Sequence, residues 1–174
     1  MRRCEVQTDQ ITKFKWFFAW QDEEEENWLH EMALKGWHLI ELNFPILYRF
    51  EKGEPRNVFY RLDYKTSPRR DMDAYLQLFK DAGWEYCGEM AGWQYFRKET
   101  RSGERLEIFT DNMSKIAKYH RVQWMAFILF LPLILVLDFN RFSIVIVLIY
   151  VLLIAFAIYA QIKLAQRIKS LHKA

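Results

Sequence analysis

The chain has 174 residues, of which 52% are hydrophobic, 17% aromatic and 27% charged, and its net charge is +3. Residues 161–174 alone contribute +4, so the rest of the chain carries −1, and this near-neutral balance argues against a nucleic-acid-binding protein. Cys4 and Cys87 have neither disulfide-scaffold nor metal-ligand spacing, so we expect unpaired thiols in a reducing compartment, with no metal and no cofactor.

The predicted elements begin after an N-terminal arm at residues 1–12. The sequence KFKWFFAW at 13–20 alternates aromatic residues with others, and this period of two predicts a strand with one buried face. Trp16 belongs to the face that we expect to be buried, and Phe17 belongs to the opposite face.

An amphipathic helix is predicted next, at 21–36, from apolar residues at helical spacing. Asp22 and Glu25 have the spacing of a capping box at its start. We interpret the acidic run at 23–26 as a solvated feature, because carboxylates interact favourably with the positive end of the helix dipole.

Two Gly-Trp pairs, at 36–37 and 83–84, stand 47 residues apart, and each follows a predicted helix, at 21–36 and 71–83. Glycine accepts the left-handed conformation that ends a helix without a steric penalty. We expect each tryptophan to pack back on the last turn of its helix.

The order strand, helix, Gly-Trp, strand, strand occurs twice, in units 13–57 and 58–111, and Tyr48 matches Tyr95 at the same offset. The further strands are predicted at 37–42, 46–53, 58–65, 84–90, 93–99 and 105–111. We therefore predict an α+β domain in which duplicated β-α-β-β units form one mostly antiparallel sheet, with two helices on one face, related to ferredoxin-like folds.

The C-terminal third predicts a transmembrane hairpin at 122–160. A juxtamembrane helix at 112–121 continues without proline or glycine into an apolar segment at 122–137, and a second apolar segment follows at 142–160. These segments approach or reach the ~20 residues that cross a bilayer. Only residues 138–141 separate them, so we expect both outer ends on the same side of the membrane.

Basic residues flank the outer ends of the predicted hairpin, whereas Arg141 alone lies in its turn. The flanking residues are Lys115, Lys118, Arg121, Lys163, Arg167, Lys169 and Lys173. The positive-inside rule then predicts a cell-membrane protein with two spans and with both termini in the cytoplasm. The basic tail at 161–174 either lies on the anionic inner leaflet or is a solvated helical stub.

The sequence contains no phosphate-binding glycine loop, nucleophile elbow, HExxH motif or CxxC pair, so we do not expect an enzyme. Glu26 and His30 are four residues apart, but without further ligands we expect a solvated helix face rather than a metal site. Cys87 follows Tyr86 in a predicted strand, and we expect it to be packed rather than nucleophilic.

One face of the predicted sheet combines cations with aromatic rings. Its residues are Lys13, Lys15, Phe17, Arg49, Phe59, Arg61, Asp63 and Lys65. Such a surface binds an anionic or planar ligand or a partner protein, and the alternative is a solvated sheet face.

The phrases KFKWFFAWQDEEEENWLHEMALKGWHL and GWEYCGEMAGWQYFRK, followed by the double span, resemble a family of small bacterial membrane proteins known only as a domain of unknown function. The resemblance covers most of the chain. Members of that family are often encoded beside PadR-type transcriptional regulators. The resemblance thus implies a membrane location and a regulatory context, and it brings no catalytic residues.

These observations favour a membrane-anchored cytoplasmic binding or regulatory module without catalysis. The alternatives are an accessory subunit of a membrane complex such as a transporter, and, third, a membrane-bound enzyme of unrecognised type. The expected partners are the lipid bilayer and another protein, itself embedded in the membrane or not. A homo-oligomer is compatible with all three hypotheses.

Overall fold

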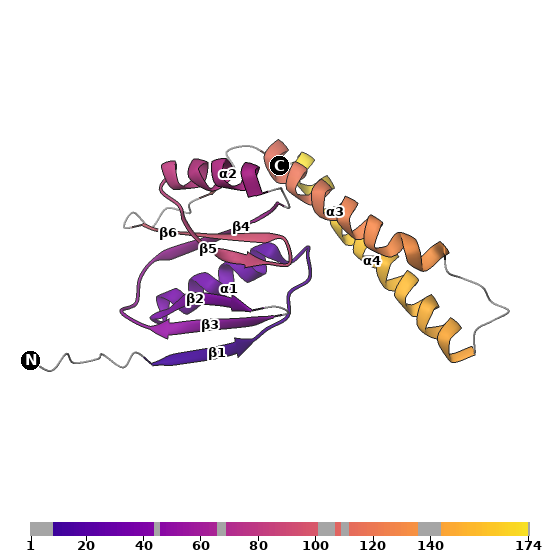
Figure 1. Ribbon diagram of the computed structural model, residues 1–174, viewed down its shortest axis with the longest axis horizontal. Helices are drawn as coiled ribbons and strands as arrows, with labels where there is room; N and C mark the ends of the chain where they lie inside the picture. Colours follow the sequence, from indigo (N-terminus) through magenta and orange to yellow (C-terminus); the bar gives the residue numbers. More distant parts are fainter. Residues whose placement is uncertain are drawn as a thin grey trace, which may run out of the picture. The chain divides into compact units, whose positions relative to one another are not determined.

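The computed structural model describes residues 9–43, 46–65, 69–100, 107–108, 112–135 and 144–173. It divides into two compact units, Met1–Ile108 and Phe109–Ala174 (Figure 1). The first unit contains β1 (Gln10–Phe14), α1 (Asp22–Leu34), β2 (Trp37–Asn43), β3 (Leu47–Lys52), β4 (Val58–Tyr64), α2 (Arg69–Asp81), β5 (Glu85–Met90) and β6 (Trp93–Glu99).

The first unit is an α+β domain, as predicted, but its strands form two antiparallel sheets rather than one. The first sheet has the order β1-β3-β2, and the second sheet has the order β4-β6-β5. Helix α1 lies between the two sheets, whereas α2 covers the other face of the second sheet (Figure 1). The prediction of two helices on one face of a single sheet is therefore wrong.

The main hydrophobic core explains this arrangement, because α1 contributes apolar residues to both sheets at once. Leu29 and Ala33 of α1 are fully buried. They belong to one cluster with Tyr48 and Phe50 from the first sheet and with Tyr60 from the second. A smaller cluster on the opposite face of the second sheet joins the α2 residue Phe79 to Trp84 and Phe96.

The two halves of this unit have the same strand order and the same irregularity. The pairing of β2 with β3 shifts between Leu39 and Glu41, and the pairing of β5 with β6 shifts between Tyr86 and Gly88, which stand 47 positions later. Because β-bulges are conserved among related structures, an irregularity at corresponding positions supports the duplication.

The two hairpins differ by one residue in their turns. Three residues separate the paired Asn43 and Leu47, whereas two separate the paired Met90 and Trp93. Because side chains alternate across a strand, this shift turns β6 over relative to β3. Tyr95 therefore points to the main core, as Tyr48 does, although α2 lies on the opposite face of its sheet.

Both helices end at their Gly-Trp pairs, as predicted. Gly36 and Gly83 have φ angles of 78° and 80°, and the Trp84 N–H donates to the Phe79 carbonyl at 2.9 Å, which closes the helix end. Trp37 packs against the main core, and Trp84 packs with Phe79. A Cβ added at Gly36 would lie 2.4 Å from the Gly53 carbonyl oxygen, so only glycine fits there.

The first strand is Gln10–Phe14, and the aromatic alternation at 13–20 does not continue it. The Gln21 N–H donates to the Phe18 carbonyl at 2.8 Å, and the Phe18 N–H donates to the Gln21 side chain at 3.1 Å. These local bonds form a turn before α1, and they replace the bonds of a strand. Trp16 is 59% exposed and Phe17 packs on Trp28, which is the reverse of the predicted facing.

The remaining predicted elements agree closely with β2–β6 and α2. The exception is the strand predicted at 105–111. Of these residues the structure describes Glu107 and Ile108, and neither belongs to a strand.

The second unit consists of α3 (Asn112–Leu135) and α4 (Ile144–Lys173). The juxtamembrane segment is continuous with the first apolar segment in α3, as predicted, and the predicted turn at 138–141 lies outside the described residues. The helices are antiparallel, because Gln161 donates to the Gln123 carbonyl at 3.3 Å and Arg167 donates to the Tyr119 hydroxyl at 3.2 Å.

Within the described residues, one stretch, Ile146–His172 of α4, is long and apolar enough to cross a membrane. Its 27 residues span about 40 Å as a helix. A second span in α3 stays a prediction.

Candidate functional site

The predicted cation-aromatic surface does not form as one face, because its residues are divided between two sheets and a loop. Lys13 and Arg49 are exposed on the first sheet. Lys15 and Phe17 lie in the loop before α1. The other four, Phe59, Arg61, Asp63 and Lys65, lie in or directly after β4 of the second sheet.

Arg61 and Asp63 are buried, with 3% exposure each, and so do not belong to an open surface. Arg61 Nη1 lies 3.3 Å from Glu26 Oε2, and Arg61 Nη2 lies 3.2 Å from Glu107 Oε1. Asp63 accepts a hydrogen bond from the Tyr75 hydroxyl of α2 at 2.9 Å. These are interactions within the fold, so both residues serve the domain's own packing.

Glu26 and His30 also have a structural role that differs from the predicted solvated face. In the described part of the chain, β4 pairs with β6 alone, which leaves one edge of β4 open. The Leu62 N–H of this edge donates to Glu26 at 2.8 Å, and His30 Nδ1 lies 2.8 Å from the Val58 carbonyl oxygen. A carbonyl only accepts, so Nδ1 carries the proton. Helix α1 thus protects the sheet edge.

A buried carboxylate lies between the two sheets at the start of α1. Glu25 is 6% exposed, and its Oε1 accepts hydrogen bonds from the Tyr48 hydroxyl at 2.6 Å and the Tyr95 hydroxyl at 2.5 Å. Burial raises the pKa of Glu25, although the two tyrosine bonds act in the opposite direction. Burial likewise raises the pKa of both phenols, so they remain protonated donors at neutral pH.

Glu25 lines a cleft of about 260 Å³ between α1, the loop before it and the β5–β6 turn. Half of its twelve lining residues are aromatic: Trp16, Phe17, Phe18, Tyr48, Trp93 and Tyr95. Two others, Asp22 and Glu25, are acidic. We call this site the aromatic cleft. The sequence carried one sign of it, the matched Tyr48 and Tyr95, but the common acceptor of these two tyrosines was not foreseen.

Residues 21–131, which include most of the cleft residues, match the family described as protein of unknown function (DUF2812). The chain belongs to the DUF2812 family. No curated protein and no solved structure matches the chain. The membership agrees with the resemblance to an uncharacterised family, and the link to PadR-type regulators stays a prediction.

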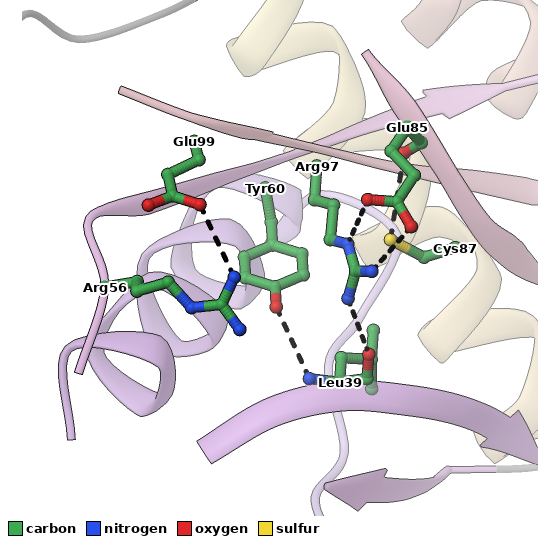
Figure 2. A network of polar contacts seen from close by, with 7 residues as sticks. All are labelled: Leu39, Arg56, Tyr60, Glu85, Cys87, Arg97 and Glu99. Carbon is green, nitrogen blue, oxygen red and sulfur yellow. Dashed lines mark hydrogen bonds and ion pairs between the residues drawn. The ribbon is translucent and has the colours of Figure 1, made fainter. Parts of the chain in front are cut away.

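A second polar cluster in this DUF2812 chain connects the two sheets (Figure 2). Arg97 of β6 donates to both oxygens of Glu85 at 2.9 and 2.6 Å, and to the Leu39 carbonyl of β2 at 3.2 Å. The Leu39 N–H donates to the Tyr60 hydroxyl at 3.4 Å. The bonds from Arg97 lower the pKa of Glu85, so this pair within the second sheet is ionised, and it fixes the guanidinium that reaches the first sheet at the Leu39 carbonyl.

Cys87 lies beside this cluster but is poorly suited to nucleophilic chemistry. Its thiol lies 3.8 Å from the Glu85 carbonyl oxygen (Figure 2). Burial raises the pKa of the Cys87 thiol to about 12, so the thiolate is scarce at neutral pH. The packed interpretation of Cys87 agrees with this geometry. Among the described residues, no group of three or more His, Cys, Asp or Glu side chains is placed to hold a metal ion.

Proposed function

We propose that this DUF2812 chain is a membrane-anchored cytoplasmic module that binds an organic ligand in the aromatic cleft and does so in a regulatory role, without catalysis. The observation that carries the proposal is the cleft itself, which combines aromatic walls with the buried Glu25 carboxylate. A concave site with mostly apolar walls and few polar groups is the usual form of a small-molecule site.

Tyr48 and Tyr95 act as fixed hydrogen-bond donors to Glu25 and not as proton-transfer groups. Tyr48 and Tyr95 hold Glu25 at one oxygen, and both phenols have a raised pKa. A general acid or base works best when its pKa is near the working pH. The tyrosines therefore orient the carboxylate, and they do not exchange protons with a ligand at neutral pH.

Exposed apolar side chains on α3 and α4 support the membrane anchor. The contact between the helices buries residues near their basic ends: Ile116, Tyr119, Val122, Ala160, Leu164 and Ile168. By contrast, residues 124–129 and 146–158 include many exposed large apolar side chains. We propose that lipid covers these side chains as two spans, with residues 1–121 and the basic tail at the anionic inner leaflet.

The anchor is tested by fractionation of cells that produce the full-length protein. We expect the protein in the membrane pellet, resistant to high salt and alkaline carbonate and released by detergent. Replacing Leu148 and Leu152, both exposed on α4, by arginine should prevent stable insertion, because each arginine near the centre of a span costs about 2.5–3.5 kcal/mol. Wild-type protein that stays in the supernatant without detergent would contradict the anchor.

Ligand binding in the cleft is tested with full-length protein in an uncharged detergent and a panel of small aromatic compounds. We expect at least one compound to quench tryptophan fluorescence, and Trp16→Ala to weaken its binding at least fivefold, because Trp16 lines the cleft. Leu78→Ala removes a similarly exposed apolar side chain on α2 and should leave binding unchanged. Equal effects of the two substitutions would contradict a site in the cleft.

The second candidate function is an accessory subunit of a membrane complex, in which the apolar face of α4 contacts another membrane protein. The exposed Ala155 supports this alternative, because small residues allow close helix approach. Exchange of 122–160 for an unrelated hairpin distinguishes the two. Retained function favours the binding module, and lost function favours the subunit.

A further inference from the structure

We propose that the ligand of the aromatic cleft is a small organic cation, such as an arylalkyl ammonium or an amidinium compound, with the Glu25 carboxylate as its counter-ion. This inference rests on the proposed function of the cleft as a binding site. It goes beyond that function because it names the charge and the chemical class of the ligand.

The residues that line the cleft, within the described part of the chain, include acidic side chains and no basic ones. Asp22 and Glu25 are 2% and 6% exposed, and among the twelve described residues that line the cleft there is no lysine, arginine or histidine. The N-terminus of α1 supplies about +0.5 charge, and the nearby Lys15 lies over the Phe17 and Trp28 rings. In the part of the chain that the structure describes, no cation lines the cleft beside Glu25, so a cationic ligand would be attracted there and an anionic ligand disfavoured.

The aromatic walls of the cleft also favour a cationic ligand. Ring faces carry partial negative charge and attract cations that lie within about 6 Å of the ring centre. A cation–π contact is already present at the Phe17 wall of the cleft. Lys15 Nζ lies 4.9 Å from the Phe17 ring centre and 4.7 Å from the Trp28 ring centre. Trp16 and Phe18 are in edge-to-face contact at 6.0 Å on the exposed side, so the wall is pre-arranged.

The hydrogen bonds of Glu25 involve one of its two carboxylate oxygens. Both tyrosines donate to Oε1, and no residue that the structure describes donates to Oε2. A carboxylate oxygen has capacity for a charge-assisted bond, which is stronger than a neutral one. The free Oε2 therefore gives an ammonium or amidinium group a partner that does not have to displace the tyrosines.

The size of the cleft limits the ligand. Its volume of about 260 Å³ is just below the ~300–1,000 Å³ of sites for drug-sized molecules. One aromatic ring with a short cationic group is the appropriate size, and we therefore use benzamidine and benzyltrimethylammonium as cationic probes. Benzamide and benzoate are the neutral and anionic compounds of matched shape.

The test is a titration of full-length wild-type protein, in an uncharged detergent at pH 8, with each of the four probes. We expect the cations to bind at least tenfold more tightly than benzamide, and benzoate to bind least. Glu25→Gln keeps the shape and the acceptor for the tyrosines. This substitution should lower the affinity for the cationic probes at least tenfold and leave the affinity for benzamide unchanged.

Two outcomes would overturn the inference in different ways. If benzamide or benzoate binds as tightly as the cations, the ligand class is wrong while the cleft remains a binding site. If no probe and no member of the wider aromatic panel binds, the proposed function fails together with the inference. The wild-type comparison decides the first case even if Glu25→Gln does not fold.

The pH dependence gives an independent readout. Because Glu25 must be ionised to act as counter-ion, we expect benzyltrimethylammonium, whose charge does not change with pH, to bind more tightly as pH rises from 5 to 8. The groups that face Glu25 are Asp22, Tyr48 and Tyr95. Glu25→Gln should abolish the pH dependence and Asp22→Asn should preserve it. A dependence that is lost only in Asp22→Asn would contradict the assignment of Glu25.

Discussion

Arg61→Ala is expected to lower the free energy of unfolding by about 3–5 kcal/mol. Arg61 is 3% exposed, and its guanidinium pairs with Glu26, which is itself 4% exposed. Removal of the guanidinium breaks this buried ion pair while the Glu26 carboxylate stays buried, and the loss of the pair is the main cost. Urea unfolding of the full-length protein in an uncharged detergent, followed by tryptophan fluorescence, measures the change.

Arg49→Ala is the matched control, because Arg49 also pairs with a glutamate, in this case Glu41 of the neighbouring strand β2. Arg49 and Glu41 are 46% and 39% exposed in their side chains, and exposed ion pairs contribute at most about 1 kcal/mol. We therefore expect Arg49→Ala to change the free energy of unfolding by less than about 1 kcal/mol. Similar losses in the two variants would show that Arg61 is not held as a buried ion.

Much of the local structure is predictable from the sequence. The φ angles of Gly36 and Gly83 follow from a rule that involves only the residues around a helix end. Period-two alternation identified β4, and the absence of proline and glycine before residue 122 identified the continuous start of α3. Each of these features depends only on residues that are close together in the sequence, so the local pattern is enough to predict it.

The roles of the acidic residues in α1 depend on distant partners and were predicted incorrectly. Glu25 and Glu26 occur in an acidic run at a helix start, where solvated carboxylates are common. Their partners Leu62 and Tyr95 are 36 and 70 residues away. Nothing in the local pattern distinguishes a buried acid from an exposed one when the residues that bury it come from other elements.

The division into two sheets was also beyond the local pattern. A single sheet and two sheets use the same strands, and the choice depends on whether α1 covers one sheet or lies between two. The turn at Ala91 and Gly92 is one residue shorter than its counterpart, and this shift turns Tyr95 toward α1. Trp37 and Tyr48 are as far apart in the sequence as Trp84 and Tyr95, so the sequence shows no missing residue, and the facing of β6 depends on the strand register alone.

Tyr95→Phe is expected to destabilise the protein by about 1.5–3 kcal/mol at pH 8 and by only about 1 kcal/mol at pH 5. Burial raises the pKa of Glu25 in the folded state, so the folded protein holds this proton more tightly and stability falls as pH rises through the raised pKa. The bond from Tyr95 opposes this effect, because it stabilises the ionised carboxylate. Its loss raises the pKa of Glu25 further and matters most at high pH. Urea unfolding at the two pH values measures the difference.

Tyr86→Phe provides the control for this pH dependence. The Tyr86 hydroxyl donates to the Gln94 side chain at 2.9 Å, and an amide acceptor does not titrate. We therefore expect Tyr86→Phe to cost about 1 kcal/mol at both pH values. If Tyr95→Phe shows the same loss at pH 5 and pH 8, Glu25 keeps one protonation state across that range, and the carboxylate would not serve as the titrating counter-ion in the aromatic cleft.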